Sequence, residues 1–196
     1  GLNNGRYGDG STATSQTFVQ VSTATNWLDV AGGLNHSIAL NSAGELYTSG
    51  NNIQGQLGLG NYTATNTRTQ VNTGGNPPST VSNQAISAGV NFSVYLDNFG
   101  QVHTCGSNAN GRLGIGNQGI TELTSFYPLT LQNMSYVKAG YDGCMAWNAI
   151  ELNAWGRNQY SIISTSPDAY SPVLANYTTS PIDASMGLFN IAVISD

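Results

Sequence analysis

Short stretches of alternating apolar and polar residues occur along the chain, and turn-forming residues separate them. Residues 37–40 alternate in this way, a turn sequence follows at 41–44, and a second short stretch covers 45–48. Two such stretches joined by a turn predict a β-hairpin. No long segment has the 3.6-residue apolar period of an amphipathic helix. The pattern therefore predicts an all-β fold.

The same pattern returns later in the chain, in register. Residues 30–40 (VAGGLNHSIAL) align with residues 86–96 (ISAGVNFSVYL), so that Leu40 falls on Leu96 at an offset of 56 residues. The same offset places glycines on glycines: Gly44 on Gly100, Gly50 on Gly106, Gly55 on Gly111, Gly58 on Gly114 and Gly60 on Gly116. Repetition at a fixed period of this size predicts a repeat architecture.

A third copy and two half copies account for the rest of the chain. The third copy begins near Val137, contains Trp155-Gly156, and loses its Gly-rich loop at residues 160–163. Residues 1–21 resemble the back half of a copy, with glycines at 5, 8 and 10, and residues 182–196 resemble the front half. We expect one domain, 1–196, divided into a half copy at 1–26, full copies at 27–83, 84–134 and 135–180, and a half copy at 181–196.

Each copy contains the elements of a small sheet. Its front half is a hairpin, and its Gly-rich back half, residues 50–60 in the first copy, needs positive φ angles or close backbone approach. A Thr/Asn-rich strand follows and ends near Val71. About four short strands per copy is the size of one blade of a β-propeller.

The first full copy resembles a known repeat. Residues 27–40 (WLDVAGGLNHSIAL), 44–50 (GELYTSG) and 52–60 (NIQGQLGLG) are similar to one repeat of the RCC1 (regulator of chromosome condensation) family of β-propellers. The resemblance covers nearly the whole chain and weakens toward its end. The family's Trp-Gly pair survives only at Trp155-Gly156, whereas Ser49-Gly50 and Cys105-Gly106 replace it in the other copies.

The resemblance implies a ring of seven blades, of which this chain holds about four blades' worth of repeats, three full and two half. We expect the chain to be part of a larger seven-bladed ring. In the alternative, the two half copies pair and close a small four-bladed ring. The founding member of the family exchanges nucleotide on a small GTPase and docks on chromatin, which implies a basic surface and a wedge loop. The longest insertion here, residues 72–81, carries no charge.

Composition excludes several classes of protein. Only 8% of the residues are charged, against about 25% in typical globular domains. No apolar run reaches the roughly 18 to 20 residues of a membrane-spanning helix, so we expect no membrane insertion. The five cations are scattered singly and the net charge is −5, which argues against a nucleic-acid partner. Disorder is a poor match because apolar blocks recur regularly.

The candidate catalytic groups favour structural roles. His36 has Phe92 and Gly143 at its counterpart positions, and no aspartate is placed by the sequence to orient it, so we expect a structural histidine. His103 replaces Tyr47 on an outer strand, where we expect it to be exposed. We therefore assign no catalytic residue.

The glycine motifs favour packing over ligand binding. Residues 55–60 and 111–116 resemble phosphate-binding loops, but no following helix is predicted, and their recurrence indicates packing between blades. Residues 8–11 (GDGS) are too short for a calcium loop. We therefore assign no cofactor-binding residue, no cofactor and no metal ligand.

The remaining side chains leave a few options. Cys105 and Cys144 lie in different copies, and we expect two buried free thiols. Asn61 and Asn176 match the glycosylation pattern, which occurs by chance in a chain so rich in Asn, Ser and Thr. Six of the ten tyrosines fall in loop-rich back halves, where they suit either packing or a protein or sugar partner: Tyr7, Tyr62, Tyr127, Tyr160, Tyr170 and Tyr177.

Function is not decided by the fold, because propellers serve many purposes. The charge-poor, Asn/Thr/Ser/Gly-rich composition is similar to that of phage tail, fibre and capsid-surface proteins, and RCC1-like repeats occur in large phage virion proteins. The leading hypothesis is a non-enzymatic virion component, located in the virion in multiple copies, that docks on other virion proteins or on a host surface receptor or glycan. A bacterial surface or extracellular location is the alternative.

Two other functions are weighed against it. One is a cellular RCC1-like protein-interaction module with exchange activity on a small GTPase. The other, ranked last, is a glycan-active enzyme, which needs two carboxylates about 5 to 10 Å apart, whereas the ten acidic residues are spread singly.

Overall fold

The computed structural model describes residues 5–18, 20–80, 85–158, 168–174, 181–187 and 191–195. Three four-stranded antiparallel sheets and one hairpin follow one another along the chain. The first sheet holds β1 (Trp27–Gly32), β2 (His36–Asn41), β3 (Leu46–Gly50) and β4 (Thr65–Gln70). The second holds β5 (Ile86–Ala88), β6 (Phe92–Leu96), β7 (Val102–Ser107) and β8 (Glu122–Pro128), with a short 3-10 turn at Ala109–Gly111. The third holds β9 (Tyr136–Ala139), β10 (Gly143–Trp147), β11 (Leu152–Arg157) and β12 (Asp168–Leu174), and the hairpin holds β13 (Pro181–Met186) and β14 (Ile191–Ser195).

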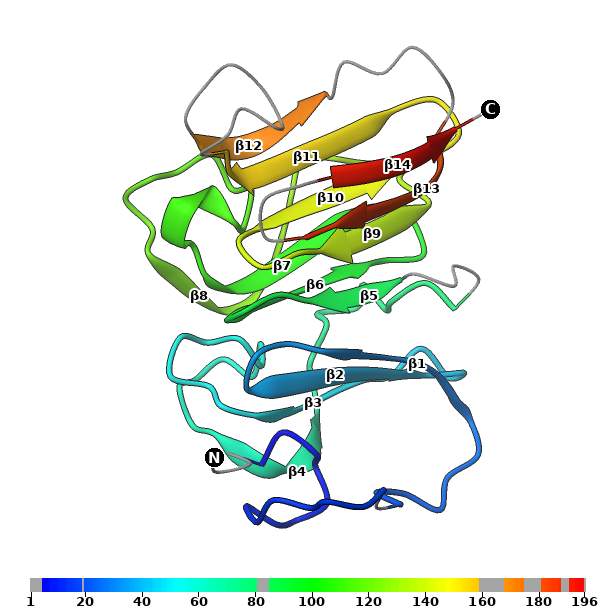
Figure 1. Ribbon diagram of the computed structural model, residues 1–196, viewed down its shortest axis with the longest axis vertical. Coiled ribbons are helices and arrows are strands. Elements are labelled where there is room, and N and C mark those ends of the chain that lie inside the picture. Colours follow the sequence, from blue (N-terminus) through cyan, green and yellow to red (C-terminus); the bar gives the residue numbers. More distant parts are fainter. Residues whose placement is uncertain are drawn as a thin grey trace.

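The sheets stack face to face as the blades of a partial propeller (Figure 1). The first strands of successive units, β1, β5, β9 and β13, are neighbours, and they mark the side of the axis. Backbone bonds join the loops beside them: Leu34 N–H donates to Val90 O at 3.3 Å, and Val90 N–H donates to Tyr141 O at 3.3 Å. The predicted all-β fold of propeller blades is therefore confirmed.

Each hairpin between the second and third strands of a sheet is closed by one asparagine or aspartate. Asn41 Oδ1 accepts the amides of residues 43 and 45, both at 3.0 Å. Asp97 Oδ1 accepts the amides of residues 99 and 101 at 2.8 and 2.9 Å. Asn148 Oδ1 accepts those of residues 150 and 151 at 2.8 and 2.9 Å. Such side chains replace missing backbone hydrogen-bond partners at turns. The same turn position therefore carries an Asn or Asp in each of the three full copies.

The Gly-rich loops pack each unit onto the next. A β-carbon at Gly58 would overlap with the Phe126 ring of the second sheet, and one at Gly114 would lie 2.7 Å from Trp155 of the third. Both glycines have positive φ angles, 68° and 69°, a backbone region that other residues rarely adopt. Inter-blade packing, the role predicted for these loops, is confirmed.

Two apolar clusters fill the spaces between sheets. One lies between the first and second sheets and includes Leu40, Ile86 and Tyr95. The larger extends from the second sheet through the third to the hairpin and includes Trp147 and Trp155. No helix in the described part of the chain is long and apolar enough to cross a membrane.

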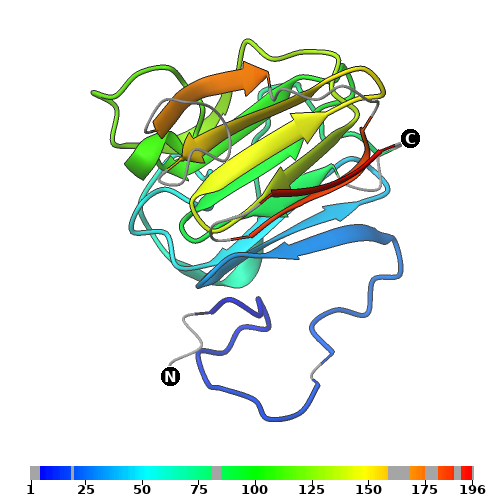
Figure 2. The same cartoon turned by 45° about the horizontal axis from the view of Figure 1, so that its top comes forward.

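The two half copies do not pair with each other in the described residues. β14 pairs with β13 alone, in a two-stranded sheet against the third sheet. Residues 5–18 and 20–26 run along the opposite end of the stack, outside the first sheet (Figure 2). The four-bladed closure is therefore wrong for this structure. Residues 11–18 and 20–26 correspond to β4 of a full copy, and they form no strand. Among the described residues, no counterpart of β3 lies beside them for them to pair with.

Candidate functional site

His36 joins two sheets. Its Nε2 lies 2.9 Å from Oγ of Ser93, and both side chains are buried. Ser93 donates its single hydroxyl proton to Gln56 O at 2.7 Å, so Nε2–H of His36 is the donor to Ser93. Nδ1 then carries a lone pair and has no hydrogen-bond partner among the described residues. Burial lowers the pKa of His36 to about 4, so the ring stays neutral at physiological pH.

The expected exposure of His103 is wrong, since its side chain is only 3% exposed. Its Nε2 lies 2.9 Å from Oδ2 of Asp97, and its ring stacks on Tyr95 with centroids 4.5 Å apart. Tyr95, on which the His103 ring stacks, lies in the apolar cluster between the first and second sheets, and the position of β7 in its own copy does not reveal this. The carboxylate of Asp97 also closes the hairpin turn, so this pair is used within the fold.

An ion-pair cluster lies between two copies, and the sequence analysis did not predict it. Arg112 Nη2 lies 2.8 Å from Asp142 Oδ1, both side chains being almost fully buried, and Arg157 Nη1 lies 3.5 Å from Asp142 Oδ2. Burial lowers the pKa of Arg112, and the charge of Asp142 partly offsets this. The cluster ties the loop of the second sheet to the third sheet. No spacing in the sequence relates its members.

The other candidates also serve the fold. Cys105 and Cys144 are free and buried, as predicted, and burial raises the pKa of both thiols. Asp9 Oδ1 accepts the amide of Ser11 at 2.9 Å, closing the turn at residues 8–11. Across the described ranges, no group of three His, Cys, Asp or Glu side chains is placed to hold a metal. Tyr160, Asn176 and Tyr177 lie outside the described residues.

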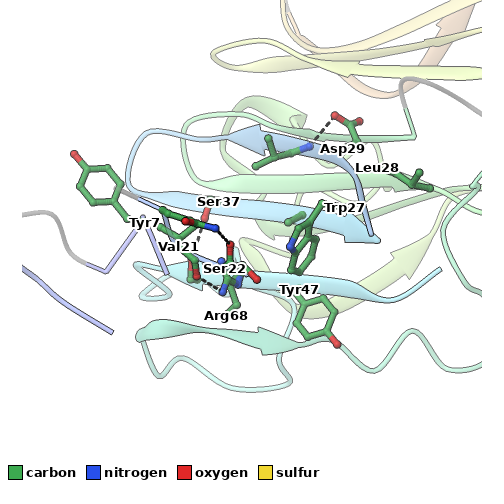
Figure 3. A pocket seen from close by; sticks show the side chains of 13 residues that line it. Tyr7, Val21, Ser22, Trp27, Leu28, Asp29, Ser37, Tyr47 and Arg68 are labelled. Atoms are coloured by element: carbon green, nitrogen blue, oxygen red, sulfur yellow. Dashed lines mark hydrogen bonds between the residues drawn. The ribbon is translucent and has the colours of Figure 1, made fainter. Parts of the chain in front are cut away.

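The feature with binding potential lies on the side of the first sheet that is turned away from the second, which we call the open face. Residues 5–18 and 20–22 cross part of it and leave a groove of about 580 Å³ between this segment and the sheet (Figure 3). Trp27, Tyr47 and Arg68 line the groove from β1, β3 and β4. Two further hollows, of about 600 and 520 Å³, adjoin it and share residues with it.

Three side chains shape the groove. The rings of Trp27 and Tyr47 meet edge to face with centroids 5.4 Å apart, and the guanidinium carbon of Arg68 lies 5.4 Å from the Trp27 ring (Figure 3). Tyr47 O–H donates to Glu45 Oε2 at 3.1 Å, and Arg68 donates to Val21 O of the crossing segment. Each ring is therefore held on a rigid sheet while part of its surface stays accessible.

The electrostatics of the groove are mixed. Burial raises the pKa of Asp29, so part of the groove is shielded from water. In the adjoining hollow of about 600 Å³, hydrogen bonds from Asn41 first, then Tyr47, lower the pKa of Glu45. The groove thus offers aromatic surface, one guanidinium and a few polar groups, an arrangement suited to binding and without an assembled nucleophile and base.

Family models match two parts of the chain. Residues 27–56 and residues 100–147 each match the Regulator of chromosome condensation (RCC1) repeat. The chain is 30% identical over 171 residues to a Bifunctional serine/threonine-protein kinase/NEDD4-like E3 ubiquitin-protein ligase of Dictyostelium discoideum, covering 77% of this chain and 9% of that protein. It is 37% identical over 86 residues to the mouse Secretion-regulating guanine nucleotide exchange factor, covering 44% of this chain and 18% of that protein.

Solved structures show the same fold. Prp20p of Saccharomyces cerevisiae, which was studied for its binding to Gsp1p and histones, superposes with a TM-score of 0.69 at 19% identity, over 85% of this chain and 42% of that one. Human WBSCR16 superposes with a TM-score of 0.53 at 19% identity, over 98% of this chain and 66% of that one. Residues 27–56 and 100–147 therefore match RCC1 repeats, the fold is that of the RCC1-like propellers, and the chain spans only a part of each of these proteins.

Proposed function

We propose that this run of RCC1 repeats is a non-enzymatic protein-interaction module that docks a protein partner on the open face of the first sheet. The observation that carries the proposal is the accessible cluster of Trp27, Tyr47 and Arg68 on that face. Trp, Tyr and Arg are the residue types that contribute most binding energy in protein interfaces.

The rigidity of the face supports binding. Trp27 and Tyr47 stand on β1 and β3, which flank β2 in one hydrogen-bonded sheet, with Ile38, Leu40 and Leu46 buried behind them. A partner would therefore meet side chains that are already oriented, and little conformational entropy would be lost on binding.

The state of the ionisable groups supports a role without catalysis. His36 is neutral and bonded to Ser93, His103 is paired with Asp97, and both thiols are buried. These are the types of group that act as nucleophiles or as general acids and bases, and here each is either bonded to another side chain of the fold or buried.

Capture experiments test this function. The immobilised chain, a Trp27→Ala/Tyr47→Ala variant and a Phe99→Ala control would be compared for the proteins they retain from cells of the source organism. Phe99 is an exposed aromatic on the turn between β6 and β7, away from the groove. We expect retention by the wild type and the control, and at least a tenfold loss for the double variant. Equal retention by all three would refute the proposal.

A cellular module is favoured over a virion component. The relatives named above are a kinase/ubiquitin ligase and an exchange factor of eukaryotic cells, and none of them is a virion protein. The virion hypothesis rests on composition and on the occurrence of RCC1-like repeats in phage virion proteins, and none of the relatives named above adds support to it. Detection of this chain in purified particles by mass spectrometry would restore it.

Exchange activity on a small GTPase is a second candidate, because the similarity to the mouse exchange factor reaches 37% identity. Release of a fluorescent guanine nucleotide from a panel of small GTPases tests it. Acceleration by the chain supports the activity, and unchanged release from every member of the panel excludes it for that panel.

A further inference from the structure

The turn between β7 and β8 contains an asparagine followed directly by a glycine, Asn110-Gly111. This pair of residues occurs twice in the chain, at 4–5 and 110–111, and only the second pair lies wholly within the described residues. Because glycine has no side chain, the backbone nitrogen after the asparagine reaches the asparagine's carboxamide carbon with little steric hindrance. Asn-Gly is therefore especially prone to cyclisation and deamidation.

Packing fixes the glycine of this pair. Gly111 has a φ angle of 75°, and a β-carbon there would lie 2.8 Å from Cα of Tyr170 in the third sheet. The residue before it is less restricted, because the first full copy carries Gln54 at the same place. The Gln54 side chain donates a hydrogen bond to the next unit, as that of Asn110 does. Either amide therefore suits the position, and the second copy carries the more reactive one.

The folded turn keeps both reacting groups bonded to other partners. The Gly111 N–H donates to Asn108 O at 3.0 Å, so its nitrogen is occupied. The Asn110 carboxamide is bonded to the third sheet, where its Nδ2 donates to Asp142 Oδ2 at 3.4 Å. The backbone of Asn110 has φ 58° and ψ 20°, a left-handed conformation that the turn enforces. Cyclisation therefore requires that the turn first open.

An ion pair keeps this turn closed. Arg112 Nε donates to Ala109 O at 2.9 Å. Arg112 Nη2 also lies 2.8 Å from Asp142 Oδ1, and both side chains are almost fully buried. Asp142 therefore holds the turn twice, through Asn110 and through Arg112. Because these contacts join the second sheet's loop to the third sheet, the turn opens only when the junction between the two sheets loosens.

We propose that Asn110 is a site of spontaneous deamidation and that opening of the junction between the second and third sheets controls its rate. The Gly111 nitrogen bonds to Cγ of Asn110, the Cγ–Nδ2 bond breaks, and the amide leaves as ammonia with the proton that the nitrogen loses. Water then opens the cyclic imide at either of its carbonyl carbons, which gives aspartate or isoaspartate at position 110. This site lies away from the open face and is separate from the proposed function.

Deamidation disrupts the folded turn. Isoaspartate adds one carbon to the main chain, so the two hydrogen bonds that span the turn no longer fit together. Aspartate keeps the main chain but replaces the donor to Asp142 with a second carboxylate. Arg112 and Arg157 lie beside Asp142, and their charges offset part of that repulsion. Isoaspartate is therefore the more damaging product, and its formation keeps the junction loosened.

The test is the rate at which Asn110 converts during incubation at mildly alkaline pH, measured by chromatography and mass spectrometry of its peptides. The guanidinium-unfolded chain gives the rate without protection. We expect the folded wild type to convert about tenfold more slowly or less, and Arg112→Gln to convert about tenfold faster than the folded wild type. Gln56 stands at the position of Arg112 in the first copy, so the repeat accepts this side chain. Asn110→Gln, which copies Gln54, is the control and should show no conversion at this site.

Wild type held at guanidinium concentrations below its unfolding transition gives the same test without a substitution, and conversion should rise with guanidinium. A folded chain in which Asn110 never converts, while the unfolded chain converts completely, overturns the proposal. Equal rates in the folded and unfolded chains overturn the control by the junction. The converted protein, separated by ion exchange, should unfold at a lower guanidinium concentration than the unconverted protein, and an unchanged midpoint overturns the proposed effect on the junction.

Discussion

Replacing His36 with phenylalanine should remove part of the acid sensitivity of this fold. The second sheet carries Phe92 at the equivalent position, where its ring covers Gly89 as the His36 ring covers Gly33. The substitution therefore uses a side chain that the same architecture already accepts. Ser93 still donates to Gln56 O after the change, so no buried hydroxyl proton is left without an acceptor.

The magnitude follows from the pKa of His36, which burial lowers from 6.5 to about 4. Between these values the unfolded chain binds a proton that the folded chain does not, so stability falls as the pH falls through this window. The penalty is absent above pH 6.5, reaches about 2 kcal/mol at pH 5, and levels off near 3 kcal/mol below pH 4. The cause is desolvation of the charged ring, whose Nδ1 has no partner within the described residues.

Urea unfolding followed by tryptophan fluorescence, at a series of pH values from neutral to acidic, measures the effect. We expect the unfolding free energies of the wild type and His36→Phe to differ by a few tenths to about 1 kcal/mol at neutral pH. The acid-induced loss of stability should be about 2 kcal/mol smaller in the variant at pH 5. Parallel pH profiles for the two proteins would show that His36 titrates normally in the folded state and would refute the reasoning.

Three other predictions concern packing and burial. Gly58→Ala should cost about 2 to 4 kcal/mol in unfolding free energy, against about 1 to 2 for Gly74→Ala, because both have positive φ but a β-carbon at Gly74 meets open space; equal losses in urea unfolding would contradict the packing role. Asp142→Asn should cost about 3 kcal/mol by breaking the buried pair with Arg112, and a loss below about 1 kcal/mol would show that the pair is solvated. Both cysteines should resist iodoacetamide until the chain unfolds, because they are buried and the pKa of each is raised; labelling of the folded protein, detected by mass spectrometry, would contradict this.

Much of the fold could be predicted because its signals are local. The hairpin turns at Asn41 and Asp97 and the loops around Gly58 and Gly114 depend on backbone conformations set within a few residues. Their recurrence at one offset then identified the repeat. The same offset relates Asn52 and Asn108, whose side chains donate to carbonyl groups across their loops. The sequence analysis did not predict this pair, although the repeat offset relates the two asparagines.

The candidate site could not be predicted in the same way. Tyr47 and His103 occupy equivalent strand positions, yet Tyr47 lines a groove and His103 is buried. Arg112 and Asp142 meet although they lie in different copies. In each case the surroundings of the side chain depend on which neighbouring unit packs against it. Such packing is a contact between residues far apart in the chain.

The amino-acid sequence alone determined that the chain builds glycine-rich, four-stranded units with equivalent hairpins, because alternation and turn chemistry act over short distances. Only the tertiary structure decided which face of each unit is covered. Val30 and Ile86 show the reason: they hold the same position in successive copies, and only Ile86 has a neighbouring sheet to exclude water from it.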